Sequence, residues 1–218
     1  MTTAYRLHGA FRSSAVHRVR IALNLKGLVP ERIPVNLMEG EQHGAAFRAL
    51  NRQGLVPVVE TPDGDRLVQS MAIIEYLDET HPSPSLLPGN AAQRAHIRAI
   101  AQVIACDIHP LNNLRVLNKV RALGHDEAAV IAWYHDWLRA GFEALEVMLT
   151  RHGEMRYCAA DTPTLADICL VPQVYNAEIY KFDLSPYPAV QRVTANCRAL
   201  DTFTRAAPHN QPEAQKTA

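Results

Sequence analysis

Residues 55–70 of this 218-residue chain read LVPVVETPDGDRLVQS. Two short apolar runs flank the sequence Pro-Asp-Gly-Asp at 62–65, and proline and glycine at these positions favour a β-hairpin turn. Ser70 then stands where a helix begins and can cap its N-terminus. The apolar stripe of that helix consists of Ile73, Ile74 and Leu77. The stretch predicts two antiparallel strands that lead directly into a helix.

The residues before this hairpin alternate between strand and helix patterns. Residues 5–9 are short and partly apolar, residues 15–25 carry apolar side chains at helical spacing, and residues 31–37 alternate apolar with polar residues. A short helical turn is expected at 47–51. With the hairpin and its helix, the order becomes β-α-β-α-β-β-α, which predicts a small α/β domain.

Prolines separate this domain from the rest of the chain. Residues 81–89 contain three prolines and a glycine. We expect an α/β domain at 1–82, a linker at 83–90, an all-helical domain at 91–207 and a flexible polar tail at 208–218. The expected helices of the second domain cover residues 92–108, 112–123, 127–151, 165–175 and 189–200. Thr164 and Asp167 form a variant of the capping box at the start of the fourth.

The composition excludes several classes of protein. Lys+Arg and Asp+Glu both total 22, so the formal net charge is zero, which argues against binding to nucleic acid or to anionic membranes. Arg6 and Arg12 interrupt the N-terminus where a signal peptide needs an unbroken apolar core. No segment approaches the length of a membrane span. We therefore expect a cytoplasmic protein with neither nucleic acid nor membrane as a partner.

Arg12, Ser13 and Ser14 lie between the first expected strand and the first expected helix. Serines at such positions commonly serve as N-caps. A helix N-terminus also presents free N–H groups and a positive dipole end, which favour a thiolate, a phosphate or a carboxylate. A hydroxyl donor in that setting can lower the pKa of a thiol. Because the chain has no cysteine nearby, such a thiol would belong to a ligand.

Two further features lie at the ends of the hairpin strands. Pro57 stands near the start of an apolar strand, where a missing N–H is tolerated. A cis bond before it would turn the Val56 backbone outward, toward a peptide-like ligand. Gln69 and Ser70 occupy the junction of strand and helix. Ser70 there either caps the helix or, with the helix terminus, holds a ligand carboxylate.

These three features, in this order and on this frame, resemble the glutathione transferases. Residues 12–23, RSSAVHRVRIAL, are similar to the signature of the zeta class. Further similar segments are residues 49–51, 69–77, 107–114, 163–167 and 183–188. The resemblance covers residues 5–207, and the class includes maleylacetoacetate and bacterial maleylpyruvate isomerases. It implies a thioredoxin-like α/β domain followed by an all-α domain, and a homodimer.

The resemblance also implies roles for individual residues. Ser13 would lie beside the sulfur of the cofactor, glutathione, with Ser14 next to it, and Arg12 would add positive potential. Arg12 and Arg115 would bind the carboxylates of the substrate. The glutathione-binding residues would be Gln42, Val56, Pro57, Gln69, Ser70, His109 and Asn113. His109, which directly precedes Pro110, could equally cap a kinked helix.

The implied activity is a glutathione-dependent cis-trans isomerisation of maleylacetoacetate or maleylpyruvate in the breakdown of aromatic amino acids or aromatic acids. In that reaction the thiolate of glutathione adds to the cis double bond, the resulting single bond rotates, and the thiolate leaves. One alternative is a general glutathione transferase that conjugates small electrophilic acids and consumes glutathione. Another is a non-catalytic interaction protein of the same fold, which would be expected to have a damaged Ser13 or Gln69-Ser70 motif.

The sequence departs from the class pattern at two positions. Ala15 replaces the cysteine of the usual Ser-Ser-Cys sequence. Ile179 stands where the family usually has an arginine, which is expected to help bind a substrate carboxylate. Lys181 lies two residues further, where a continuing helix would direct its side chain elsewhere. These departures therefore affect the identity of the substrate more than they affect the binding of glutathione.

The four cysteines generate a direct test. Cys106, Cys158, Cys169 and Cys197 form no close pair and have no metal-ligand spacing, so we predict four free thiols and no bound metal. Titration of thiols in the denatured, non-reduced protein should count four. A count of two or zero would contradict this prediction.

Overall fold

The computed structural model describes residues 4–151 and 153–215. Within them, the chain forms two compact units. The first comprises residues 4–85 together with 199–215, and the second comprises residues 86–198. The elements of the first unit up to residue 80 are β1 (Arg6–Gly9), α1 (Ser14–Leu25), β2 (Glu31–Pro34), η1 (Glu41–His43), α2 (Ala45–Leu50), β3 (Val58–Glu60), β4 (Arg66–Val68) and α3 (Ser70–Thr80). The expected β-α-β-α-β-β-α order is confirmed.

The strands form one sheet in the order β2-β1-β3-β4. β1 runs parallel to β2 and antiparallel to β3, and β3 runs antiparallel to β4. In this register His8 lies opposite Val58, and Val58 lies opposite Val68. The C-terminal ends of β1, β2 and β4 therefore lie at the same end of the sheet as the N-terminal end of β3.

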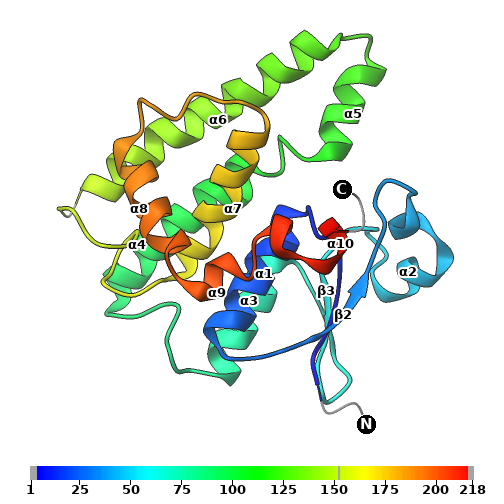
Figure 1. The fold of residues 1–218 in the computed structure, drawn as a ribbon, viewed down its shortest axis with the longest axis horizontal. Coiled ribbons are helices and arrows are strands. Elements are labelled where there is room, and N and C mark those ends of the chain that lie inside the picture. The colour runs from blue at the N-terminus through cyan, green and yellow to red at the C-terminus, as the bar shows by residue number, and fades with distance from the viewer. Residues whose placement is uncertain (1–3, 152, 216–218) are drawn as a thin grey trace. The chain divides into compact units, whose positions relative to one another are not determined.

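Helices cover both faces of this sheet. Figure 1 shows α1 and α3 together on one side of the strands and α2 on the other. Phe47 of α2 packs with Val35 and Val58. Val58 and its neighbour Val59 are both fully buried, as expected for a strand that is covered on both faces.

Two strands are shorter than the sequence pattern indicates, because side chains bond to the backbone beyond their ends. β2 stops at Pro34 rather than at residue 37, since the Asn36 side chain accepts hydrogen bonds from the N–H groups of Met38 and Glu39. Before β3, the Asn51 side chain donates to the carbonyl of Leu55 at 2.7 Å. The chain there forms a loop rather than strand.

The C-terminal segment of the first unit differs from the expected helical domain and flexible tail. It contains α9 (Asp201–Thr204), η3 (Pro208–Asn210) and α10 (Pro212–Gln215), and Figure 1 shows it beside α1. The Asn24 side chain of α1 donates to the carbonyl of Thr202 at 2.8 Å. Gln211 is 2% exposed and accepts a hydrogen bond from Arg32. These long-range bonds order the polar residues 208–215; residues 216–218 of the expected tail lie outside the described residues.

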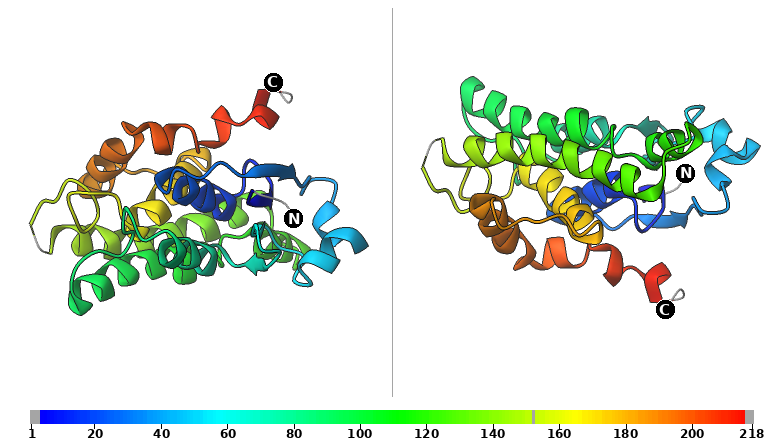
Figure 2. Two further views of the ribbon diagram at one scale, coloured as in Figure 1. Left: turned by 90° about the horizontal axis from the view of Figure 1, so that it is seen from below. Right: turned by 90° about the horizontal axis from the view of Figure 1, so that it is seen from above.

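The second unit is built from helices. They are α4 (Ala91–Gln102), the π-helical segment η2 (Val103–Ile108), α5 (Leu114–Ala122), α6 (Glu127–Thr150), α7 (Leu165–Ile179) and α8 (Pro188–Arg198). In both views of Figure 2, α7 lies inside this unit, in contact with α4, η2 and α8. Among the described residues, no helix combines the length and apolar character that crossing a membrane requires.

The expected helix at 92–108 is divided, because its last six residues form η2. Ile108 at the end of η2 packs against Gly141 of α6, where any added Cβ atom would collide with the Ile108 side chain. The absence of a side chain at Gly141 thus lets η2 approach α6. This contact fixes the chain just before His109.

The expected capping box at the start of α7 is confirmed. The Asp167 carboxylate accepts hydrogen bonds from the N–H and hydroxyl groups of Thr164, both at 2.8 Å, and from the N–H of Cys158. Burial raises the pKa of Asp167. None of the four cysteines forms a disulfide within the described residues, and all except Cys106 are buried. Burial also raises the pKa values of the Cys158 and Cys197 thiols, which makes them poor nucleophiles.

A charged network joins the edge strand β2 to the central strands β1 and β3. The Glu60 carboxylate lies 2.5 Å from Nε2 of His8 and 3.1 Å from Nη1 of Arg6. The hydrogen bond with His8 lowers the pKa of Glu60, with a further contribution from Arg6. Arg6 also pairs with the more exposed Glu31. A carboxylate whose pKa is lowered by folding stabilises the folded state above its unfolded pKa, and this stabilisation disappears as the pH falls through the folded pKa.

We therefore predict that Glu60→Gln lowers the free energy of unfolding at neutral pH by about 1–2 kcal/mol, the scale of a hydrogen bond to a charged group. The difference from the unchanged protein should narrow below roughly pH 4, where carboxyl groups protonate. Thermal unfolding measured across that range tests both points. Glu31→Gln is the matched control and should have a smaller effect, since its side chain is 54% exposed. A Glu60→Gln effect that is independent of pH would contradict the assignment.

Candidate active site

Ser13 is the N-cap of α1. Its hydroxyl oxygen accepts a hydrogen bond from the N–H of Val16 at 3.3 Å. Because this bond uses a lone pair, the hydroxyl proton remains available, and it has no acceptor among the described residues. Ser13 can therefore cap α1, as expected, and donate its hydroxyl proton to a ligand at the same time. It lies at the positive end of the helix dipole.

The other two residues of the motif flank this donor in different environments. Arg12 is exposed, with its guanidinium carbon 5.1 Å from the centre of the Phe11 ring. Ser14 is the first residue of α1 and is buried. A turn leads into the motif, closed by the N–H of Ser13, which donates to the carbonyl of Ala10 at 3.1 Å. Arg12 is thus the motif's accessible cation and Ser13 its free hydroxyl donor.

The peptide bond between Val56 and Pro57 is cis, as the sequence pattern suggested. Neither the N–H nor the carbonyl of Val56 forms a hydrogen bond to any described residue. A main-chain donor and acceptor are thus left for a partner outside the chain. An extended peptide is the ligand that satisfies both, in the manner of an added strand.

Gln69 and Ser70 form the junction between β4 and α3. Gln69 has φ 69°, a left-handed value that residues other than glycine rarely adopt and that marks candidate functional positions. Its side-chain amide donates to the Gln53 side chain at 2.9 Å. Ser70 is buried at the first position of α3, and neither its N–H nor its hydroxyl has a partner within the described residues. This helix N-terminus suits a carboxylate.

Gln42, in η1, carries a second unsatisfied polar group. Its side-chain oxygen is buried and has no hydrogen-bond partner in the part of the chain that the structure describes. The Gln42 carbonyl lies against Gly54, where a Cβ atom would come within 3.0 Å of it. Gly54 also has φ 64°, so both the turn and the close approach require glycine. This packing brings η1 next to the loop that contains Val56.

The sheet register explains why these groups lie together. Ser13 follows β1, Val56 precedes β3 and Ser70 follows β4, and these three strand ends lie at one end of the sheet. The unsatisfied groups comprise a hydroxyl donor, a peptide donor–acceptor pair and a helix N-terminus. A short peptide that bears a thiol and a free carboxylate matches all three. Glutathione has this chemistry, so the residues of the first unit fit it.

The predicted residues of the second unit lie on the segment between η2 and α6. His109 caps η2, and its N–H donates to the carbonyl of Ile104 at 2.9 Å. Asn113 is the N-cap of α5, where its side-chain oxygen accepts from the N–H of Arg115. Asn112 anchors the segment by donating to the carbonyl of Tyr134. His109 and Asn113 thus have capping roles in the structure in addition to the ligand roles that the resemblance implies.

Arg115 lies on the wall of a groove of about 540 Å³ between α5 and the start of α6. Lys119 lines the same groove one turn along α5, opposite Trp133. Neither cationic side chain has an ion-pair partner among residues 4–151 and 153–215. The groove can therefore offer positive charge to a carboxylate bound against apolar side chains.

The segment around residue 179 differs from expectation in one respect. Ile179 is the last residue of α7 and is 55% exposed. The helix ends there, and Lys181 adopts φ 55° beyond it. The helix thus runs beyond the expected end at residue 175 but stops before Lys181, so the comparison of side-chain directions along one helix does not apply to Lys181.

Two residues that organise the site were not singled out as candidate site residues from the sequence. Asn51 holds the loop before Val56 through its side chain, which donates to the carbonyl of Leu55 and accepts from the N–H of Gln53. Gln53 in turn holds Gln69. The Asn-x-x-Gly pattern at 51–54 is a turn signal that indicates such a loop. No local pattern indicates the contact between Gln53 and Gln69, which are 16 residues apart.

Comparisons with known proteins agree with this fold. Residues 12–80 match the glutathione S-transferase N-terminal domain. The chain is 50% identical, over 95% of its length and 97% of the relative, to a probable maleylacetoacetate isomerase of Vibrio cholerae. It superposes with a TM-score of 0.93 on the holo structure of a zeta-class bacterial maleylpyruvate isomerase, at 48% identity over 95% of this chain and 99% of that one.

A further solved structure is that of maleylacetoacetate isomerase from Anaeromyxobacter dehalogenans, with dicarboxyethyl glutathione and citrate bound in its active site. Its TM-score is 0.87 at 42% identity, over 97% of each chain. Fold, site geometry and full-length similarity agree. The chain belongs to the zeta class of glutathione transferases, the family of the maleylacetoacetate and maleylpyruvate isomerases.

Proposed function

We propose that this protein is a glutathione-dependent cis-trans isomerase of maleylacetoacetate or maleylpyruvate, in the breakdown of aromatic amino acids or aromatic acids. The observation that carries the proposal is the set of unsatisfied groups at one end of the sheet: the Ser13 hydroxyl, the Val56 main chain and the N-terminus of α3. The relatives similar over the full length of the chain support the same reaction.

Different residues bind the three parts of glutathione. The Val56 main chain, shaped by Pro57, pairs with the cysteinyl part. Ser70 and the N-terminus of α3 hold the γ-glutamyl carboxylate, and Gln69 is fixed beside them by Gln53. The unsatisfied Gln42 side-chain oxygen accepts from the glycyl end. His109 and Asn113 are the residues of the second unit assigned to glutathione in this proposal.

When bound, glutathione supplies a thiolate that adds to the maleyl double bond and later leaves it. Ser13 donates its free hydroxyl proton to the sulfur, and Arg12 and the α1 dipole lower the thiol pKa by adding positive potential. Ser14 supports the same helix N-terminus. Arg12 and Arg115 bind the carboxylates of the substrate. Burial raises the pKa values of the Cys158 and Cys197 thiols, so these two do not compete as nucleophiles.

We also infer a cytoplasmic location and a homodimer. The location is supported by the four cysteines, none of which forms a disulfide within the described residues, since thiols persist in reducing compartments. The homodimer rests on the family resemblance.

Ser13→Ala tests the activation of the thiol. We predict a loss of kcat of roughly one to three orders of magnitude, the range for removing one well-placed donor. The affinity for glutathione should change little, because the γ-glutamyl end is bound by Ser70 and the N-terminus of α3. Steady-state kinetics with glutathione titrations measure both quantities.

Ser13→Thr is the matched control, since it keeps both the cap and the hydroxyl, and it should retain most of the activity. An unchanged kcat in Ser13→Ala would assign the activation to the helix end, Ser14 or Arg12 instead.

Ile179→Arg tests the substrate. An arginine at this exposed position can add a bidentate partner for a carboxylate without repacking the core. We predict that maleylacetoacetate or maleylpyruvate is isomerised with glutathione unconsumed, and that Ile179→Arg lowers KM by about tenfold, the equivalent of roughly 1.4 kcal/mol. Ile179→Gln, which is polar but uncharged, should not reproduce this change.

Two results would contradict the substrate assignment. Absence of isomerisation with both maleyl acids would favour another electrophile. Stoichiometric loss of glutathione during turnover would move the protein to the conjugating transferases.

A further inference from the structure

Arg12 and Ser13 belong to a turn formed by residues 10–13, just before α1. The N–H of Ser13 donates to the carbonyl of Ala10 and closes the turn, whose central residues are Phe11 and Arg12. The peptide between these two residues is the one whose rotation interconverts the common turn types. The hydrogen bond from Ser13 to Ala10 is compatible with either orientation, but the flipped one needs a positive φ at Arg12, which an arginine rarely adopts and which Arg12 does not have. The turn therefore favours the observed direction of the Phe11 carbonyl without anchoring it to the rest of the fold.

Arg20 adds this anchor from within α1. Its Nη2 atom donates to the carbonyl of Phe11 at 3.0 Å. Its Nε atom donates to the carbonyl of Ala206, in the C-terminal segment, at 2.8 Å. The residue is 7% exposed, so both bonds lie in a largely dry environment. A planar guanidinium holds its donors in a fixed fork, and one side chain therefore sets the position of two carbonyls.

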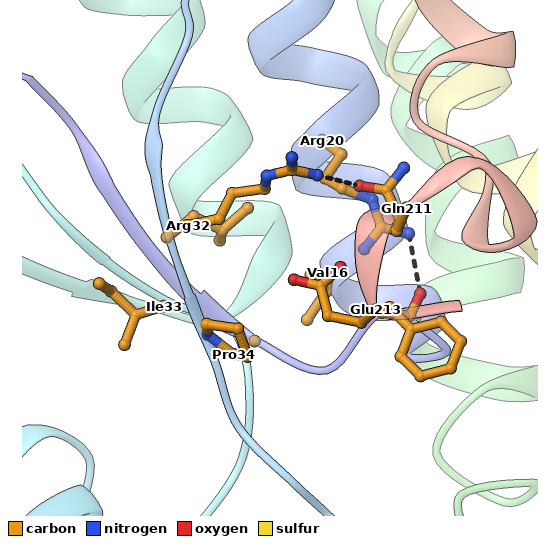
Figure 3. A pocket seen from close by; sticks show the side chains of 10 residues that line it. Val16, Arg20, Arg32, Ile33, Pro34, Gln211 and Glu213 are labelled. Atoms are coloured by element: carbon orange, nitrogen blue, oxygen red, sulfur yellow. Dashed lines mark hydrogen bonds between the residues drawn. The ribbon is translucent and has the colours of Figure 1, made fainter. Parts of the chain in front are cut away.

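The C-terminal end of this link is itself held in place. Asn24 donates to the carbonyl of Thr202, and the Gln211 side chain donates to the carbonyls of Arg205 and Ala207. Figure 3 shows Arg20 and Arg32 directed toward the segment that carries Gln211, with the bond between Arg32 and Gln211 drawn. The Ala206 carbonyl is thus a fixed anchor for Arg20.

Packing does not replace this hydrogen bond. A cavity of about 20 Å³ lies beside the turn, and Phe11, Val16 and Arg20 are among the residues that line it. This volume is about that of a water molecule, so the walls leave space next to the Phe11 side of the turn. The guanidinium of Arg20 is therefore the group that ties the Phe11 carbonyl to the C-terminal segment.

We propose that Arg20 is a positioning residue of the isomerase site: by bonding the central peptide of the turn at 10–13 to the C-terminal segment, it fixes Arg12 and Ser13 for action on glutathione. The inference rests on the proposed role of Ser13. A displacement of the reacting groups by about 1 Å can cost a factor of about a hundred in rate, so a restraint two turns away along α1 affects the chemistry.

The experiment measures the ionisation of glutathione bound to the protein, by the ultraviolet absorbance of its thiolate as a function of pH, together with kcat and KM. Arg20→Lys keeps the charge but loses the fork that spans two carbonyls. We expect it to raise the pKa of the bound thiol by roughly one pH unit and to lower kcat about tenfold, while KM for glutathione changes less than about threefold. Arg20→Gln serves if the lysine variant does not fold.

Asn24→Leu is the matched control, because it removes one bond between α1 and the same C-terminal segment, while Arg20 and Gln211 still hold the chain at Ala206. It should lower the melting temperature but leave the thiol pKa and kcat near those of the unchanged protein. If Asn24→Leu and Arg20→Lys changed kcat and the thiol pKa equally, Arg20 would contribute only to general stability, and the inference would be overturned.

The remaining outcomes separate this inference from the proposed function. An unchanged thiol pKa and kcat in Arg20→Lys, with a lowered thiol pKa in the unchanged protein, would overturn the positioning role alone. A bound thiol with the pKa of free glutathione in the unchanged protein would overturn the proposed function and the inference with it.

Discussion

The register of β1, β3 and β4 is the constraint on which the rest of the site depends. Because β3 runs antiparallel to both neighbours, the residues that follow β1 and β4 meet those that precede β3 at one end of the sheet. Two helix N-termini and one unpaired peptide group therefore lie close together. A shift of β3 by one residue would move Val56 away from both helices and would break the bonds of Glu60 to Arg6 and His8.

Local chemistry carries most of what could be predicted from the sequence. The hairpin turn, the cap at Ser13 and the capping box of Thr164 and Asp167 depend on neighbouring residues, and the structure contains all three. The ordered C-terminal segment was not predictable, because Arg20 and Ala206 are 186 residues apart and residues 208–218 have the polar composition of a tail. The composition of a segment indicates only its local conformational preference. The bonds that Arg20, Asn24 and Arg32 donate to the C-terminal segment depend on the tertiary fold.

The two departures from the class pattern affect different parts of the site. Ala15 removes a thiol beside the first helix, yet the Ser13 hydroxyl remains free to donate, so the donor proposed for thiol activation is present without that cysteine. Ile179 leaves an exposed apolar residue at the end of α7. The first departure concerns a group beside an intact site, and the second concerns the partner of a substrate carboxylate. The proposed catalytic groups are therefore better defined than the fit of the substrate.

The central claim is that glutathione binds across the end of the sheet, between α1, the loop before β3 and α3. Backbone amide NMR during a titration with glutathione tests it most directly, because it reports residue by residue and needs no turnover. Within the first unit, the amides of Val56 and Ser70 should show the largest shifts, and Gly64, in the hairpin turn at the opposite end of the sheet, should not move. Saturable binding with no shift at Val56 or Ser70 would contradict the account.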